Sequence, residues 1–189
     1  DFDMITRLYA NNFRCLVSFE AGFDSFGVLC GPNGAGKSSV FDALRLLRNL
    51  GTGDAILGGT GEQDIPGLEF TDWLDSTVQE FELSLTVDGH AFEYRIHIEQ
   101  KADFEKPRII QENASCDKKL LFKRDLEGVE FVKGDGTQAG FPLDWRQSAL
   151  AAIQPRGVNI SKVALLQEEI AKLLILRPNP RGMERESRA

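Results

Sequence analysis

The sequence predicts an α/β protein, because three kinds of segment follow one another along its 189 residues. A glycine-rich stretch, 31–38, joins a short apolar run to a segment with apolar residues every three or four positions, as in an amphipathic helix. A later section, 77–135, alternates apolar and polar residues as half-buried strands do. The expected fold is therefore a helix packed on a mixed sheet, followed by an antiparallel β section.

The composition fits one soluble globular domain, since 42% of the residues are hydrophobic and 27% are charged. No apolar run approaches the roughly 18 residues of a membrane span, and Asp1-Phe2-Asp3-Met4 lacks the features of a signal peptide. We therefore expect a cytoplasmic protein with no membrane partner. Cys15, Cys30 and Cys116 form no Cys-x-x-Cys pair, which favours reduced thiols to which no chemical role is assigned.

Charge is unevenly distributed behind the net value of −7. Residues 51–100 hold one basic and eleven acidic side chains, so they are a poor candidate for a nucleic-acid groove. The arginines near the end of the chain favour a solvated tail over a phosphate-binding patch.

The first thirty residues predict strands. Ile5 and Leu8 would precede a turn at Asn11-Asn12, and Phe13 to Phe19 would follow it. The apolar run Phe26-Gly27-Val28-Leu29-Cys30 is typical of a buried strand. Together with the helix that follows to Leu50, where Gly51 and Gly53 end it, these strands make up the first part of the domain, 1–50.

The rest of the chain predicts three further parts: an acidic, glycine-rich excursion at 51–76, the β section, and helices with a closing strand at 145–176. In the β section, a turn at Asp88-Gly89 would pair Val87 with His90, and Leu85 with Phe92. The same register pairs Leu83 with Tyr94 and Phe81 with Ile96. Further strands are expected at 108–114, 119–124 and 129–133, helices at 145–154 and 160–174, and the closing strand at 173–176.

The glycine-rich stretch carries the chemistry. Gly31-Pro32-Asn33-Gly34-Ala35-Gly36-Lys37-Ser38 fits the phosphate-loop pattern of Gly, four residues, Gly, Lys, and Ser or Thr. A strand before it and a helix after it would aim backbone N–H groups and a helix N-terminus at phosphate oxygens. We expect Lys37 to bridge the β- and γ-phosphates, Ser38 to bind Mg²⁺ through its hydroxyl, and Ser39 to reach the α-phosphate.

The loop resembles that of ABC-type ATPases, more closely the RecF, SMC and OLD group, and so does Asn12-Phe13-Arg14 ahead of it. With Met4-Ile5-Thr6-Arg7-Leu8 and Phe41-Asp42-Ala43-Leu44-Arg45, these pieces look like the N-terminal portion of predicted AAA-type ATPases of the RecF/SMC-like superfamily. Later segments are also similar, namely Phe141-Pro142-Leu143-Asp144, Ser148-Ala149-Leu150 and Leu176-Arg177-Pro178-Asn179-Pro180-Arg181.

The resemblance implies a nucleotide-binding lobe in which ATP and Mg²⁺ lie between two copies of the protein. Its expected nucleotide-binding residues are Gly31, Asn33, Gly34, Ala35, Gly36, Lys37, Ser38 and Ser39, with Ser38 as the metal ligand. Asn33 would approach the γ-phosphate. Arg14 would lie near the nucleotide, and an Arg facing solvent is the alternative. A family glutamine falls on either Gln154 or Gln111.

Parts needed for hydrolysis are not found in the sequence. No run of four apolar residues ends in Asp-Glu; Leu83 to Asp88 comes nearest, but its alternation marks it as a hairpin strand. Leu57-Gly58-Gly59-Thr60-Gly61 lacks the serine of a family signature and is interpreted as a loop. The chain therefore looks like a lobe without its C-terminal partner, with no catalytic residue of its own. It should bind ATP more readily than cleave it.

Three functions follow as hypotheses. The first is the ATP-binding portion of a dimerising ATPase linked to DNA repair, chromosome maintenance or phage defence, with DNA as a candidate partner. The second is a complete small P-loop kinase or GTPase, although the guanine-reading Asn-Lys-x-Asp is absent. The third is a non-catalytic interaction module with a vestigial loop. His90 and His97 are interpreted as hairpin surface residues that do not cluster with a cysteine.

Overall fold

One antiparallel sheet organises the residues that the computed structural model describes, which are 3–101, 106–132, 137–153 and 161–175. Its strand order is β2-β1-β3-β4-β5-β6-β7-β8. The strands are β1 Met4–Asn11, β2 Phe19–Gly22, β3 Val78–Val87, β4 His90–Glu99, β5 Arg108–Cys116, β6 Lys119–Arg124, β7 Val129–Val132 and β8 Gln138–Phe141. Every neighbouring pair is antiparallel. The expectation of a mixed sheet beneath the first helix was therefore wrong, because β1 and β2 join the later strands.

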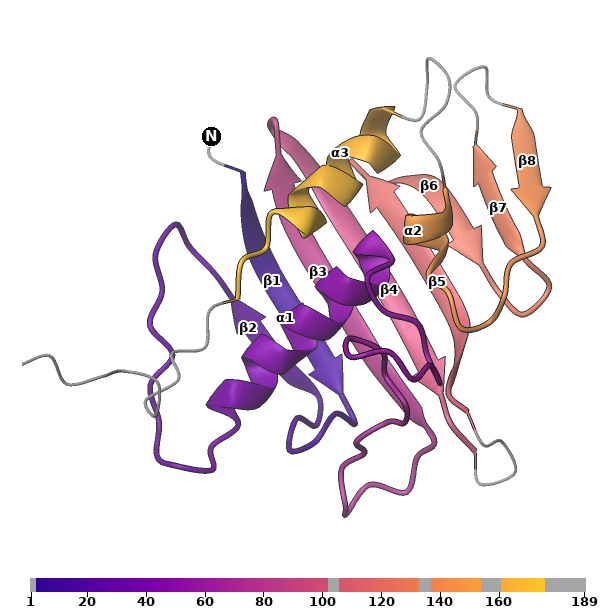
Figure 1. Ribbon diagram of the computed structural model, residues 1–189. Coiled ribbons are helices and arrows are strands. Elements are labelled where there is room, and N and C mark those ends of the chain that lie inside the picture. The colour runs from indigo at the N-terminus through magenta and orange to yellow at the C-terminus, as the bar shows by residue number, and fades with distance from the viewer. Residues whose placement is uncertain (1–2, 102–105, 133–136, 154–160, 176–189) are drawn as a thin grey trace, which may run out of the picture.

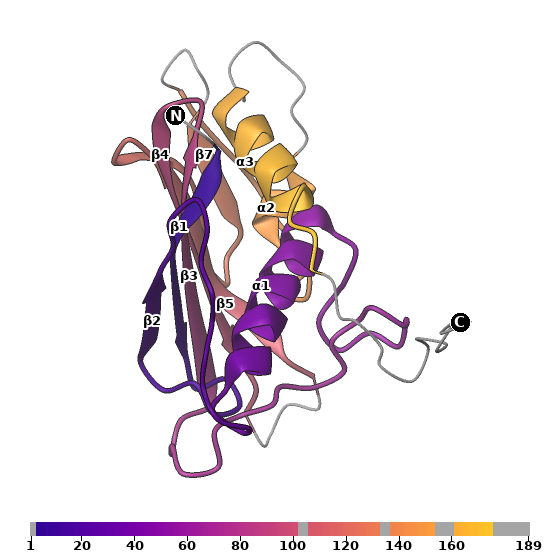
Figure 2. The same cartoon turned by 90° about the vertical axis from the view of Figure 1, so that its left-hand side faces the viewer.

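The helices of the described ranges, α1 Lys37–Thr52, α2 Ala149–Ala152 and α3 Ser161–Ala171, cover one face of this sheet. Figure 2 shows the sheet from its edge, with the helices on one side. Gly51 lies where α1 packs against α2 and α3. A Cβ on it would stand 3.2 Å from side-chain atoms of Leu150 and Ile170. It is thus inside α1, and the helix ends at Gly53, whose φ of 78° suits its C-cap position.

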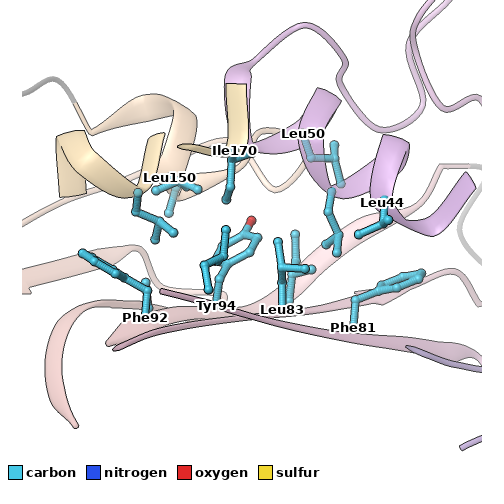
Figure 3. Close-up of a cluster of buried hydrophobic side chains, with 14 of the residues drawn as sticks. Leu44, Leu50, Phe81, Leu83, Phe92, Tyr94, Leu150 and Ile170 are labelled. Atoms are coloured by element: carbon cyan, nitrogen blue, oxygen red, sulfur yellow. The ribbon is translucent and has the colours of Figure 1, made fainter. Parts of the chain in front are cut away.

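The alternation of β3 and β4 explains why the core lies between sheet and helices. Phe81 and Leu83 on β3, and Phe92 and Tyr94 on β4, are buried and point toward the helical layer (Figure 3). The expected hairpin is confirmed, including the pairing of Val87 with His90 across the Asp88-Gly89 turn.

The other face of the sheet is lined with ion pairs. Arg7 on β1 donates to Glu20 on β2 at 2.8 Å and to Glu82 on β3 at 2.7 Å, so one side chain connects three strands. Arg95 on β4 lies 3.4 Å from Glu82. Charged residues at alternate positions keep this face hydrated, and the same period directs the intervening residues into the core.

The strand expected before the phosphate loop is not formed. Residues 26–30 have no strand assignment (Figure 1). Phe26 and Val28 are 83% and 71% exposed. A strand needs neighbours for its backbone N–H and C=O groups, and none of the described strands pairs with this segment. The run between β2 and α1 is therefore a loop outside the sheet.

Three other boundaries differ from the sequence expectations. β1 continues through Asn11, and residues 13–18 form turns with an isolated bridge between Phe13 and Leu16. The helix expected at 145–154 is only Ala149–Ala152, because Ser148 is the N-cap and accepts from the Ala151 N–H through its Oγ. Gln154, the last residue of the expected range, lies outside the described residues. Of the expected closing strand, 173–175 are not in a strand, and Leu176 lies outside the described residues.

A buried polar cluster joins the sheet to α2. The Glu112 carboxylate, fully buried, accepts hydrogen bonds from the Tyr94 hydroxyl at 2.9 Å, the Ser148 hydroxyl at 2.7 Å and two backbone N–H groups at the start of α2. Buried Arg124 lies 3.8 Å from Glu112 and donates to the carbonyl oxygens of Asp144 and Gln147. Glu112 thus anchors a helix of four residues that could not form alone.

Candidate functional site

The phosphate-loop pattern lies where the chain enters α1. Gly36 is the N-cap of this helix with φ 86°, and Gly34 has φ 85°. Both values belong to the left-handed region, which only glycine adopts at little cost. The two glycines therefore let the backbone turn sharply before Lys37 begins the helix.

The N-terminus of α1 is open to an anion. Gly36 has no side chain with which to cap the first turn, and that turn contains no acidic residue. The first N–H groups of a helix have no partner within it, and the helix dipole places partial positive charge there. Asn33, Gly34 and Ala35, which precede this end of the helix, are exposed to solvent.

Lys37 folds back over the loop. Its Nζ donates to the carbonyl oxygens of Gly31 and Pro32, each at 2.6 Å. None of the carboxylates in the described part of the chain forms an ion pair with it. The ammonium group is thus held by two carbonyl oxygens, and no carboxylate of the described ranges competes with an incoming anion for it.

The two serines after Lys37 have different surroundings. Ser38 is exposed at the start of α1, whereas Ser39 is 7% exposed and its Oγ lies 3.5 Å from the Cys15 sulfur. A Cβ on Gly36 would stand only 2.8 Å from the same sulfur. Cys15 therefore supports the loop from beneath, a role that sequence reasoning missed because no motif marks this residue.

Arg14 lies beside α1, where acidic side chains hold its guanidinium. Nε and Nη2 donate to the Glu69 carboxylate at 2.7 and 2.9 Å, and Nη1 donates to Asp42. The hydrogen bonds to Glu69 are the main reason why the pKa of Arg14 is raised above its ordinary value. Asp42 is buried on α1 and also accepts from Arg45 at 2.8 Å. The arginine thus links the turn after β1 to α1 and to residue 69.

The other two residues of the Asn-Phe-Arg segment have structural partners. The Asn12 amide donates to the carbonyl oxygens of Ser76 and Val78 at 2.9 Å and accepts from the Thr71 N–H at 3.1 Å. The Phe13 ring packs edge-on against Phe81 with 5.4 Å between centroids. This turn is therefore fixed against both the sheet and the loop that precedes β3.

A groove of about 960 Å³ runs along α1, away from the phosphate loop. Arg14, Asp42 and Glu69 line it, together with part of the 62–69 loop and residues 171–175. None of residues 31–39 lines this groove. Motif and backbone geometry, rather than cavity size, thus identify the candidate site.

Other candidates from the sequence lie elsewhere. Gln111 is an exposed residue of β5, and Gln154 lies outside the described residues. The segment Leu57–Gly61 is a loop, closed by Asp64, whose carboxylate accepts from the N–H groups of Ile56 at 3.0 Å and Gly61 at 2.7 Å. An added Cβ would meet this carboxylate at Gly59 and Gly61, whereas at Gly58 it would meet the Lys106 side chain.

The interpretation of His90 as a residue with no cysteine nearby was wrong. Its possible ligand atoms lie within 4.8 Å of those of Cys116 and Asp117. The error arose because Cys116 is 26 residues away in sequence, and only the pairing of β4 with β5 brings the two together.

Comparison with known families agrees with the fold and the loop. A family model described as the AAA ATPase domain matches residues 4–134, which is more than half of the chain. The chain belongs to this family and is a P-loop ATPase of the AAA and RecF-like kind, a class of nucleotide-binding proteins. No curated protein matches the chain. None of the helices in the described ranges is long and apolar enough to cross a membrane.

Proposed function

We propose that this chain is the ATP-binding lobe of a RecF/SMC-like ATPase and that residues 31–39 hold the triphosphate. The observation that carries the proposal is the uncapped start of α1 at Lys37, whose ammonium group donates to two carbonyl oxygens of the loop. A phosphate would accept from these N–H groups and from the ammonium group more strongly than neutral oxygens do. Membership of an ATPase family supports ATP as the anion.

Each residue of the loop has a role in this proposal. Lys37 would turn from the carbonyls of Gly31 and Pro32 toward the β- and γ-phosphates, and Asn33 would approach the γ-phosphate. Gly34, Ala35 and Gly36 would contribute backbone N–H groups, and Ser39 would lie toward the α-phosphate. The ion pairs of Arg14 with Asp42 and Glu69 favour a supporting role for it beside α1 over direct contact with phosphate.

Magnesium fits this site only in part. Ser38 offers an exposed hydroxyl at the start of α1, and the phosphates themselves would supply further oxygens. When bound, Mg²⁺ neutralises charge that develops on the phosphate oxygens. The first turn of α1 contains no carboxylate to complete a hydrolytic centre. We therefore propose that hydrolysis needs acidic and signature residues other than those of the loop, and a second copy of the protein.

The biological process is a wider proposal. The resemblance of the loop and of Asn12-Phe13-Arg14 to RecF and SMC proteins favours DNA repair, chromosome maintenance or phage defence in the cytoplasm. ATP binding would close a dimer, and hydrolysis would open it. The dimer would bind DNA.

Equilibrium dialysis with Mg·ATP tests the binding step. Lys37→Ala removes the proposed phosphate-binding charge, and Lys119→Ala removes an exposed charge at the start of β6 with the same change in net charge. A lost charge-assisted hydrogen bond costs about 1.5–3 kcal/mol, so Lys37→Ala should raise Kd roughly 10- to 100-fold or more. Lys119→Ala should leave Kd unchanged.

Other outcomes would select another function. Equal affinity in wild type and Lys37→Ala would defeat the proposal. No uptake of Mg·ATP by the wild-type chain would favour an interaction module with a vestigial loop. Transfer of the γ-phosphate to a small acceptor would favour a kinase-like phosphotransferase.

A further inference from the structure

Two turns of the sheet bring together three side chains that can bind a metal ion. β4 begins at His90 and β5 ends at Cys116, and these strands pair antiparallel with Phe92 opposite Cys116. His90 is two residues before Phe92, so it lies on the same face of the sheet as the cysteine. Asp117 directly follows Cys116. The three residues therefore meet at one end of the sheet, remote in sequence from residues 31–39.

Their polar atoms form a close group. His90 Nδ1 lies 2.6 Å from Asp117 Oδ2, and the Cys116 sulfur lies 3.7 Å from the same oxygen. The possible ligand atoms of all three residues lie within 4.8 Å of one another. In a tetrahedral zinc site, bonds of about 2.3 Å to sulfur and about 2.0 Å to oxygen place these two atoms about 3.5 Å apart. The observed separation of sulfur and oxygen is close to this value.

The backbone holds this arrangement without an ion. Asp117 Oδ1 accepts from the Ala91 N–H at 3.0 Å, and the Asp117 N–H donates to the Ala91 oxygen at 2.8 Å. One carboxylate oxygen is thus fixed by β4, while the other faces the imidazole and the thiol. Asp117 and Lys118 have φ of 49° and 65°, as in a tight hairpin turn that sets the direction of the carboxylate.

One of the three residues is buried and the other two are partly exposed to solvent. Cys116 is 5% exposed, whereas the side chains of His90 and Asp117 are 39% and 49% exposed. An ion could enter from solvent past the imidazole and the carboxylate and reach the sulfur last. Three protein ligands leave a fourth tetrahedral position for water or another ligand.

We propose that His90, Cys116 and Asp117 form a zinc-class metal site, separate from the nucleotide site. Thiolate and imidazole ligands select zinc and related transition metals, whereas Mg²⁺ and Ca²⁺ take oxygen ligands. Binding replaces the hydrogen bond between His90 and Asp117 with bonds to the ion and releases the thiol proton to solvent. The site ties the β3–β4 turn to the β5–β6 turn.

Titration of the reduced chain with Co²⁺, without nucleotide or Mg²⁺, tests this site. One equivalent should produce thiolate-to-cobalt charge-transfer absorption and the visible bands of tetrahedral cobalt, and Zn²⁺ should remove both. Cys116→Ser should abolish the charge-transfer band. His90→Gln should weaken binding at least about tenfold, since even the loss of a residue that only orients a metal ligand costs about that much. His97→Gln and the pair Cys15→Ser with Cys30→Ser are matched controls that should keep the full spectrum.

Two results would overturn the proposal. The first is a wild-type titration with no charge-transfer band, which needs no variant and does not depend on how a substitution folds. The second is an unchanged band in Cys116→Ser, or its loss in the Cys15 and Cys30 control, since either would place the metal on another thiol. ATP binding enters neither result, so failure here leaves the nucleotide proposal intact.

Discussion

The sulfur of Cys15 lies 3.5 Å from the hydroxyl oxygen of Ser39 and fills the space behind Gly36. The turn after β1 thereby contacts the loop at Gly36 and the first turn of α1 at Ser39. Residues 13–19, which the sequence predicts as a strand, thus include a turn that packs against the start of α1.

This contact predicts a difference between two glycines with similar backbone angles. Gly36 has φ 86° and Gly89 has φ 74°, but an added Cβ meets nothing within 4 Å at Gly89 and meets the Cys15 sulfur at 2.8 Å at Gly36. Gly89→Ala should lower the free energy of unfolding by about 1 kcal/mol, the cost of a left-handed residue. Gly36→Ala should lower it by a further 1–3 kcal/mol or so through overpacking. Urea unfolding measures both.

A double variant separates the steric cost from the backbone cost. Adding Cys15→Ala to Gly36→Ala should recover most of the overpacking loss, whereas adding it to Gly89→Ala should not. Equal losses for Gly36→Ala with and without Cys15 would show that the sulfur does not limit this position.

The ion pairs of Arg14 predict an effect on stability larger than its effect on nucleotide affinity. Arg14→Ala removes an ion pair of the buried Asp42 carboxylate and the pair with Glu69, and should cost about 2–3 kcal/mol of unfolding free energy. Arg95→Ala breaks ion pairs on the face of the sheet that the helices do not cover, and should cost at most about 1 kcal/mol. Urea unfolding and Mg·ATP dialysis are the two measurements. A large loss of ATP affinity in a stable Arg14→Ala protein would assign the arginine to the nucleotide.

Removal of the Glu112 carboxylate should be among the most destabilising single changes in the sheet. Glu112→Ala removes the carboxylate that pairs with buried Arg124 and leaves two N–H groups of α2 without this acceptor, which should cost about 3–5 kcal/mol. Glu112→Gln keeps one acceptor oxygen and should cost less. Glu130→Gln, which breaks an exposed pair with Lys123, should stay within about 1 kcal/mol. Similar thermal unfolding temperatures for all three variants would contradict this ranking.

Asp64 predicts a stability difference that depends on pH. Hydrogen bonds from the N–H groups of Ile56 and then Gly61 hold the pKa of its carboxyl below the ordinary value of 3.8. A depressed folded-state pKa stabilises the protein above the unfolded-state pKa, and this contribution is lost as pH falls through the folded-state value. Asp64→Asn should therefore be less stable than wild type at pH 7, and the gap should narrow below about pH 4. A gap that stays constant from pH 7 to pH 3 would exclude this linkage.

The success of the sequence interpretation depended on how local each signal was. The Asp88-Gly89 hairpin was predicted residue by residue, because a two-residue turn and the alternation on both strands fix one register. The position of α1 followed from its periodicity. The run Phe26–Cys30 misled because its apolar residues predict a buried strand only if neighbouring strands exist, and pairing is a property of the sheet rather than of the run.

The candidate site also consists of residues that a local motif could identify and residues that only the fold brings together. Gly31 to Ser39 are contiguous, so a motif could find them, and the structure places them at the start of α1. Cys15 and Arg14 contact Ser39 and Asp42 of that helix, and Glu69 in turn holds Arg14, but no spacing rule links these residues. The cluster of His90 with Cys116 likewise depends on which strands are neighbours.

The most direct test of the account is a crystal structure of this chain grown with Mg²⁺ and a non-hydrolysable ATP analogue. The account predicts phosphate density at the start of α1, with Lys37 Nζ moved from the carbonyl oxygens of Gly31 and Pro32 onto phosphate oxygens. An analogue bound in the groove along α1, or a loop whose Lys37 keeps both carbonyl contacts at saturating nucleotide, would contradict it.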